Sequence, residues 1–96
     1  MKKPYEVLKE EMKNQGLIQR ELALRTGVSE KHISTVLSGS KSISPSFAKK
    51  LEYALGMDAI FWINLQANYD KELLKQKKLF TNWNIFYYKE WEKGQT

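Results

Sequence analysis

The apolar positions between residues 19 and 39 follow the helical period in two short runs. Leu22 and Ala23 form an apolar patch in the first run. The second run repeats at i, i+3 and i+4, with apolar side chains at Ile33, Val36 and Leu37. This pattern predicts two short helices, each with one apolar face, joined by a tight turn.

The residues between these two helices favour a sharp turn. Gly27 can adopt the backbone conformation of such a turn, Val28 supplies a small apolar side chain, and Ser29 is placed to N-cap the second helix. This arrangement is typical of a helix-turn-helix, whose second helix enters the major groove of DNA. The outward positions all carry hydrogen-bonding side chains: Glu30, Lys31, His32, Ser34 and Thr35.

Helical spacing and capping residues predict three further helices. The first covers residues 4–15, with a proline in its first turn and a glycine directly after it. After a polar loop, Ser44 can cap a helix that begins with a proline and ends at Gly56. Asp58 can cap a fifth helix over residues 59–75.

The five predicted helices describe a compact all-α bundle, because only short loops join them. The bundle occupies residues 1–74 as one domain, which is large enough to fold unaided. The expected core consists of apolar residues on the inward faces: Leu8, Met12, Leu22, Ala23, Val28, Ile33, Val36, Leu37, Phe47, Leu51, Leu55 and Phe61.

The charge distribution favours a polyanionic partner. The chain of 96 residues has a formal net charge of +5 and a pI near 9.4. Residues 19–56 contain six Lys or Arg and three Glu, so the largest surplus of positive charge coincides with the predicted helix-turn-helix. Charge alone does not identify nucleic acid as the partner, so the motif carries most of the argument.

Several chemistries are excluded by the residues that are missing. The chain has no cysteine, which rules out disulfides, thiolate zinc ligands and a cysteine nucleophile. It has one histidine, no HExxH and no recognisable pair of carboxylates, so we expect neither an enzyme nor a metal or cofactor site. No apolar run approaches a membrane span, and the N-terminus lacks a signal-peptide core, so we expect no membrane contact and a cytoplasmic location.

From residue 75 onward the composition changes. Residues 75–96 contain six of the twelve aromatic residues of the chain. Four of them fit helical spacing, at Phe80, Trp83, Tyr87 and Trp91. The run from Trp83 through Ile85 to Tyr87 also fits the alternation of a strand, so periodicity leaves both open, and we favour a helix. We expect this aromatic C-terminal extension to pack on a second subunit, on another protein or back across the domain.

Three blocks of sequence carry a family likeness. They are ELALRTGVSEKHISTVLSG at residues 21–39, ISPSFAKKLEYALG at 43–56 and FWINLQANYD at 61–70. Together they closely resemble the Xre (phage-repressor-like) family of helix-turn-helix regulators. More narrowly, they resemble its HigA/VapI branch, the antitoxins of HigBA-type toxin–antitoxin modules. The first block specifies only the broad superfamily, whereas the FWxNLQxxYD pattern of the third is the more specific signature.

The resemblance implies a fold and a function. The fold is a five-helix lambda-repressor-like DNA-binding domain, and the aromatic extension lies outside the family pattern. The function is sequence-specific DNA binding as a homodimer on a palindromic operator, with repression of the protein's own operon and binding of a RelE-like ribonuclease toxin. Very similar domains precede ImmA/IrrE-type metallopeptidase domains, so the alternative is an Xre-family transcriptional regulator or adaptor with a non-toxin protein partner.

The resemblance and the charge pattern indicate which side chains hold the DNA backbone. A glutamine at the start of the first motif helix meets a phosphate in similar proteins, which points to Gln19. Lys41 and His32 are expected to bind phosphates too, and His32 more strongly below about pH 6.5. Arg20 and Arg25 either contact phosphates or are merely solvated on the helix surface.

Base reading is expected from the second motif helix. Lys31 can donate to guanine, and Glu30 can accept from cytosine. The remaining candidates have short side chains that need close approach to the bases: Ser29, Ser34 and Thr35. For Ser29 the alternative is N-capping alone. For Glu30 it is a solvent-exposed i,i+4 partner or a favourable position in the first turn of the helix. Because one domain makes few base contacts, we expect a two-fold dimer that reads half-sites about 34 Å apart.

Aromatic residues after Asp58 are candidates for a dimer or partner surface. Trp62 and Tyr69 belong either to this surface or to the core. The candidates in the extension are Phe80, Trp83, Tyr87 and Trp91. Two residues depart from the family pattern. Ile18 stands where a Ser or Thr often caps the first motif helix, and Lys41 lies one place later than the usual lysine.

Overall fold

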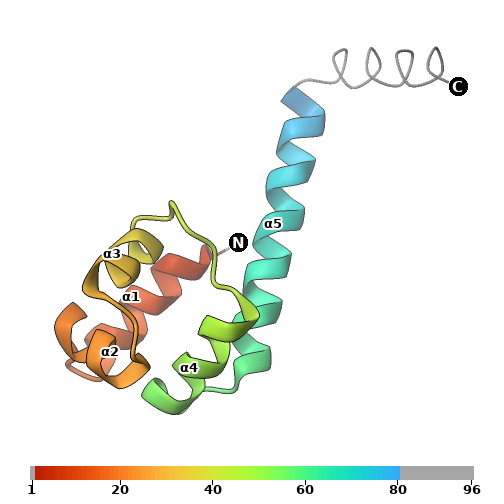
Figure 1. The fold of residues 1–96 in the computed structure, drawn as a ribbon. Helices are drawn as coiled ribbons and strands as arrows, with labels where there is room; N and C mark the ends of the chain where they lie inside the picture. Colours follow the sequence, from red (N-terminus) through yellow and green to blue (C-terminus); the bar gives the residue numbers. More distant parts are fainter. Residues whose placement is uncertain (1, 81–96) are drawn as a thin grey trace, which may run out of the picture.

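The described part of the chain folds into five α-helices, and the four shorter ones form a bundle beside the long fifth helix (Figure 1). The computed structural model describes residues 2–80, with side chains through residue 76. The helices are α1 (Pro4–Asn14), α2 (Gln19–Thr26), α3 (Glu30–Leu37), α4 (Pro45–Leu55) and α5 (Ala59–Phe80). This part of the chain contains no strand, so the predicted all-α, five-helix class is confirmed.

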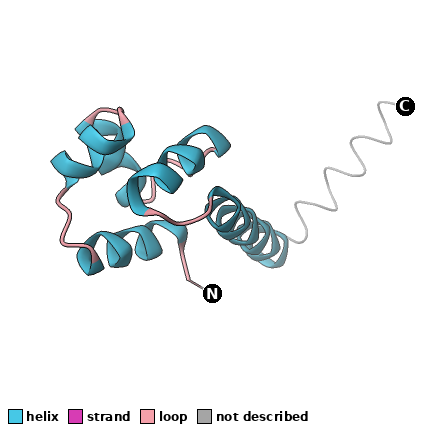
Figure 2. Ribbon diagram, turned by 90° about the horizontal axis from the view of Figure 1, so that it is seen from below, coloured by secondary structure: helices cyan, strands magenta, loops and turns pink. Residues whose placement is uncertain are grey.

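The fifth helix lies at one edge of the bundle. Helix α4 packs against α2 and against α5, α3 packs on α2 and α1, and α1 also contacts α5. The first half of α5 lies along the bundle, and its second half extends past it (Figure 1). The view from below shows α5 beside the other four helices rather than among them (Figure 2). No helix within residues 2–80 is both long and apolar enough to span a membrane.

Side-chain caps begin three helices at the predicted residues. Ser29 Oγ accepts a hydrogen bond from the backbone N–H three residues further on, at 3.0 Å. Ser44 Oγ accepts the equivalent bond at 3.1 Å, and Asp58 Oδ1 accepts one from the N–H of Ile60 at 3.1 Å. Each cap satisfies a backbone donor that the first turn of a helix leaves without an internal partner.

Helix α2 begins without such a cap, as its sequence predicted. Ile18 occupies the N-cap position and has no side-chain oxygen that could accept a hydrogen bond. The carboxylate of Glu21 accepts a bond from the N–H of Ile18 at 3.0 Å, so the reciprocal half of a capping box is present. The start of α2 therefore has one backbone donor satisfied by a side chain, and it lacks the side-chain acceptor that an N-cap residue usually provides.

Glu52 fastens the turn between α4 and α5. Its Oε1 accepts a hydrogen bond from the N–H of Ala59 at 2.9 Å, and its Oε2 pairs with Lys49 Nζ at 3.2 Å. The backbone bond, followed by the contact with Lys49, lowers the pKa of Glu52. The charged carboxylate therefore belongs to the cap of α5.

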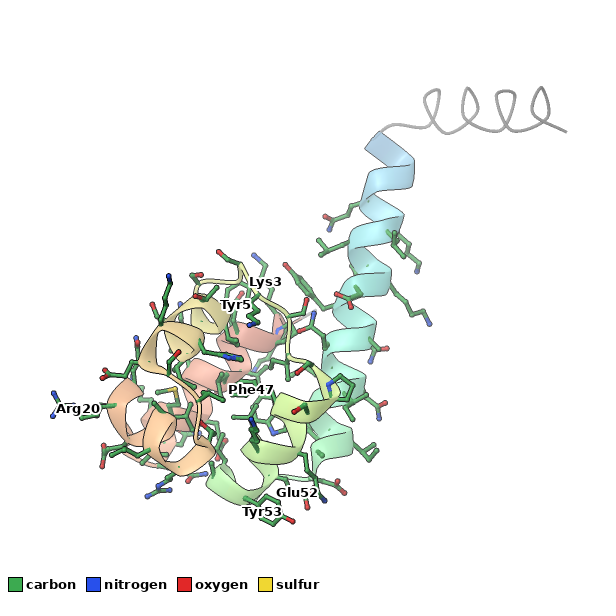
Figure 3. All side chains as sticks on the ribbon, viewed as in Figure 1. Lys3, Tyr5, Arg20, Phe47, Glu52 and Tyr53 are labelled. Carbon is green, nitrogen blue, oxygen red and sulfur yellow. The ribbon has the colours of Figure 1, made fainter. Side chains whose placement is uncertain are left out.

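The hydrophobic core lies between α1, α2, α3, α4 and the first turns of α5. Its largest fully buried side chains are Trp62, Phe47, Leu8, Leu22, Ile33, Leu51 and Val36. Figure 3 shows Phe47 pointing from α4 into the interior. Most of the expected core residues are buried, and Val28 packs against the core while partly exposed. The prediction missed several buried positions: Leu17, Ile43, Ala48, Ala54 and Ala59.

The prediction that Phe61 belongs to the core is wrong. Its side chain is 40% exposed, whereas the neighbouring Trp62 is 0% exposed. Successive residues of an α-helix are rotated by about 100°, so both rings cannot face the bundle. The side of α5 that faces the bundle continues from Trp62 to Gln66 and Tyr69. Trp62 is therefore a core residue, and the alternative placement on a partner surface does not hold.

Two polar side chains close the C-terminal end of α4. Gln15 Nε2 donates to the carbonyl of Leu55 at 2.9 Å, and Arg25 Nη1 donates to the carbonyl of Ala54 at 3.1 Å. These carbonyls have no partner within the helix, so the two side chains tie α1 and α2 to α4. Arg25 therefore has a structural role that neither of its sequence-based alternatives foresaw.

Candidate nucleic-acid interface

Helices α2 and α3 pack against each other, and both contribute side chains to the hydrophobic core. These side chains are all buried: Leu22 and Ala23 on α2, and Ile33, Val36 and Leu37 on α3. Gly27 makes the turn between the helices with a φ of 76°, a left-handed conformation that suits glycine. Because one side of α3 is fixed inside the protein, its opposite side is held rigidly toward solvent.

The outward side of α3 carries the predicted base-reading residues. Ser29, Glu30, Lys31 and Ser34 are exposed, whereas Thr35 and His32 are half-buried. Glu30 and Lys31 form no ion pair within the described part of the chain. Their charged groups are therefore available to a ligand.

The hydrogen bonds of the two hydroxyl groups define what each can still do. Ser29 uses an oxygen lone pair for its cap, so its rotatable O–H remains free to donate. Thr35 Oγ1 donates to the carbonyl of Lys31 at 2.7 Å, so its donor is already used inside the helix. Ser29 can both cap and read, while Thr35 retains its methyl group and acceptor lone pairs.

His32 is less solvated than its sequence suggested. Its ring lies against the core ring of Phe47, with centroids 4.9 Å apart and planes at 33°. Partial burial, followed by the positive charges of Lys41 and Lys50, lowers the pKa of His32 below its usual value of 6.5. Protonation of His32 in the free protein therefore requires a lower pH than we expected.

The same two lysines place positive charge beside α3. Lys41 lies in the loop between α3 and α4, and Lys50 lies on α4; both side chains are exposed. The positive charges of both act on His32, a residue of α3. Lys50 was not among the predicted residues. The position of Lys50 relative to α3 depends on how α4 packs in the bundle, and no local sequence pattern predicts that packing.

A second group of basic residues lies at the start of α2. Gln19 is exposed at the first position of that helix, where backbone N–H groups favour a phosphate. A surface hollow beside it is also lined by Lys9 and Lys13 of α1. Neither lysine was predicted, because their distance to α2 depends on the tertiary fold. Arg20 points outward from α2 (Figure 3).

The predicted partner residues are only partly covered by the structure. Tyr69 is half-buried and meets Tyr5 of α1 edge-on, with ring centroids 6.5 Å apart. Phe80 ends α5, and its side chain lies outside the described residues, as do Trp83, Tyr87 and Trp91. Among the described residues, no group of three or more His, Cys, Asp or Glu side chains could hold a metal ion.

These features define a class of protein. Five helices, a buried α2–α3 contact and an outward polar side of α3 form a lambda-repressor-like helix-turn-helix domain of the DNA-binding type. The chain belongs to the helix-turn-helix family, Xre type, whose family model matches residues 8–62.

Individual relatives narrow the comparison. Virulence-associated protein I of Dichelobacter nodosus is 34% identical over 80 residues, which cover 82% of this chain and 74% of the relative. A crystal structure from Nostoc punctiforme, assigned as an antidote protein of a plasmid maintenance system, is 28% identical with a TM-score of 0.73. It covers 97% of this chain and 92% of its own. An addiction module antidote protein of the HigA family from Coxiella burnetii is 29% identical with a TM-score of 0.74, over 78% and 83%.

Proposed function

We propose that this protein is the antitoxin of a HigBA-type toxin–antitoxin module and represses its own operon by binding a specific DNA sequence. One observation carries the DNA-binding part: α3 presents exposed polar side chains on a helix whose other side is locked in the core, with lysines beside it. The likeness to solved antidote proteins supports the antitoxin part. The role is one of binding, without catalysis.

Phosphate contacts and base contacts have separate roles in this proposal. Gln19, Lys41 and His32 contact phosphates and fix the register of the protein on the duplex, but they carry no sequence information. Lys31 donates to guanine and Glu30 accepts from cytosine at the base edges. The short side chains complete the readout: Ser29, Ser34 and Thr35.

A homodimer on a palindromic operator provides the remaining specificity. One α3 offers few base contacts, so two copies related by a two-fold axis are needed to read both half-sites. The outer half of α5 leads into the aromatic extension and carries two exposed leucines, Leu73 and Leu74. This half of α5 extends past the other four helices (Figure 1), and exposed apolar side chains in such a position are suited to a protein contact. We assign this region and Tyr69 to the contact with a second subunit or a RelE-like toxin.

DNA binding is tested with a mobility-shift assay on the region upstream of the gene, at two salt concentrations. Affinity should fall steeply as salt rises, because phosphate contacts release counterions. Lys31→Ala should reduce the preference for the operator over other sequences by about 1–3 kcal/mol. Lys41→Ala should instead weaken binding to all DNA sequences alike. Unchanged operator discrimination in Lys31→Ala would show that the assignment of the base-reading residues is wrong.

The antitoxin role is tested through the neighbouring reading frame. A small basic RelE-like protein encoded beside this gene should co-purify with this chain and should cease to arrest growth when both are expressed. Truncation after Gln76 should weaken dimerisation or toxin binding more than it weakens folding of the bundle. If no such toxin exists, the protein is a regulator with a different protein partner.

A further inference from the structure

The loop between α3 and α4 is held at its beginning by α1. Gly39 has a φ of 84°, and its N–H and that of Ser40 donate to carbonyls in the last turn of α3, at 3.0 and 3.2 Å. The ring of Tyr5 covers this glycine so closely that a Cβ there would lie 2.8 Å from Tyr5 Cε1. The first residues of the loop therefore have little freedom to move.

The end of the same loop is held by α5. The backbone N–H of Ile43 donates to Gln66 Oε1 at 2.9 Å, and Gln66 Nε2 donates to Asp70 Oδ1 at 2.9 Å. Gln66 is only 9% exposed, and the side chain of Ile43 is buried in the core. Both ends of the Gln66 amide are thus used, in a place where an unpaired polar group would be costly.

The partners of Gln66 permit only one orientation of its amide. A backbone N–H can only donate, and an ionised carboxylate can only accept. The oxygen of Gln66 must therefore face Ile43, and its nitrogen must face Asp70. Asp70 orients the amide, and the amide in turn fixes the backbone of the loop.

Lys41 lies between these two attachments. It lines a cavity of about 110 Å³ together with Tyr5, Gln66 and Asp70. We infer that Gln66, oriented by Asp70, is a positioning residue for DNA binding: it fixes the loop so that Lys41 stands where it meets a phosphate. This inference rests on the proposed DNA-binding function. It gives α5, which carries no predicted DNA contact, a defined effect on the DNA-binding side.

The first test replaces Gln66 by an apolar residue of similar shape. Gln66→Met removes both hydrogen bonds without a change of net charge. Operator affinity should fall several-fold, and the slope of log affinity against log salt should lose about 0.9 per subunit, the value for one phosphate contact. Lys41→Ala should produce the same slope, and the double variant should bind no more weakly than Lys41→Ala. Asn68→Met, an exposed amide on the same helix, is the matched control and should leave binding unchanged.

The second test exchanges donor and acceptor. In the combination Gln66→Glu with Asp70→Asn, the new carboxylate accepts from Ile43 and from the new amide, so the same two hydrogen bonds form at unchanged net charge. This double variant should recover wild-type affinity and salt slope, and hydrogen exchange of the Ile43 amide should be slow again. Recovery also answers the objection that Gln66→Met merely fails to fold.

Three outcomes would overturn the inference. In the first, Gln66→Met binds the operator as tightly as the control Asn68→Met. In the second, the losses of affinity caused by Gln66→Met and Lys41→Ala multiply in the double variant. In the third, the variant that combines Gln66→Glu with Asp70→Asn does not recover wild-type affinity. Failure of the proposed function has a different signature, because the wild-type protein itself would then show no preference for the operator and no salt dependence.

Discussion

Helices α3 and α5 use their apolar residues in different ways. Every apolar side chain of α3 is buried within the domain, at Ile33, Val36 and Leu37. Helix α5 buries Trp62 completely, but further along the helix Leu74 is 60% exposed. The domain therefore buries every apolar side chain of α3. On the outer half of α5, the described residues leave apolar side chains exposed to solvent.

This difference corresponds to the two contacts proposed for the protein, one with DNA and one with a second protein. The inner side of α3 supplies its buried apolar contacts, so the exposed residues Glu30, Lys31 and Ser34 have no packing role and are available to contact DNA. The apolar residues of α5 continue beyond the bundle, so they are suited to a protein contact. The two regions nevertheless meet, because Tyr5 and Gln66 connect the loop after α3 to α1 and α5.

The largest expected effect concerns the inner half of α5. Trp62→Ala should lower the free energy of unfolding by about 3–5 kcal/mol, because it opens a cavity where a fully buried ring was packed. Phe61→Ala changes an adjacent aromatic residue that faces outward, so its cost should stay within about 1 kcal/mol. Urea unfolding of both variants measures the difference. Equal losses would show that α5 does not distinguish its two sides as the structure indicates.

The second effect concerns the outer half of α5. Leu74→Gln keeps a good helix former and removes an exposed apolar side chain. If Leu74 becomes buried in a protein contact, its loss should weaken dimerisation or toxin binding by about 1.5–3 kcal/mol. The free energy of unfolding of the monomer should change by no more than about 0.5 kcal/mol, as for other surface positions.

The matched control for Leu74→Gln lies on α2. Leu24 is also highly exposed, so Leu24→Gln makes the same chemical change on a different surface. Analytical ultracentrifugation and titration with the toxin compare the two variants. If Leu24→Gln weakens association as much as Leu74→Gln, the contact is not specific to α5.

The third effect concerns the connection between the two regions. Gly39→Ala places a methyl group against Tyr5 and also forces a non-glycine residue to adopt a positive φ. Gly16→Ala imposes only the second cost, since its φ is 67° and nothing lies within 4 Å of a new Cβ. Left-handed backbone costs about 1–2 kcal/mol in either variant, and the close contact should add roughly 1 kcal/mol to Gly39→Ala. Thermal unfolding of the two variants measures this surplus, and equal midpoints would contradict it.

The sequence predicted what depends on neighbours along the chain. Ser29, Ser44 and Asp58 cap the helices that their positions predicted, because a cap is a contact over two or three residues. The apolar spacing of α3 likewise identified its buried side, and the outward side followed by exclusion.

Contacts between helices were much less predictable. The aromatic pair at residues 61 and 62 could rotate either way, and only the packing of α5 on α4 places Trp62 inside. Lys50 and the lysines of α1 approach the motif through the tertiary fold, so no local pattern shows them. The sequence analysis identified Gln66 only as part of the family pattern FWxNLQxxYD. Its hydrogen bond to a loop residue 23 positions away gives a structural reason for a glutamine at this position.

The smallest expected effect concerns His32, an outward residue of α3 whose ring also contacts the core residue Phe47. Burial against Phe47 lowers the pKa of His32, so the folded state favours the neutral ring. The stability that this group contributes is therefore complete above its unfolded pKa of about 6.5, and it is lost as pH falls below that value. Protonation adds a positive charge that favours phosphate, so operator affinity should rise in the same range while stability declines.

His32→Gln removes the titration and retains a polar side chain. The free energy of unfolding, from urea titration, and the operator affinity are measured for the wild type and His32→Gln between about pH 8 and 5 at constant ionic strength. The two proteins should differ by a constant amount in each quantity down to about pH 6.5 and should diverge only below it. Divergence that begins well above pH 6.5 would mean that the ring is more easily protonated than its packing on Phe47 allows. A constant difference in the free energy of unfolding down to about pH 5 would mean that folding does not lower the pKa of His32, and a constant difference in operator affinity would mean that the protonated ring contacts no phosphate.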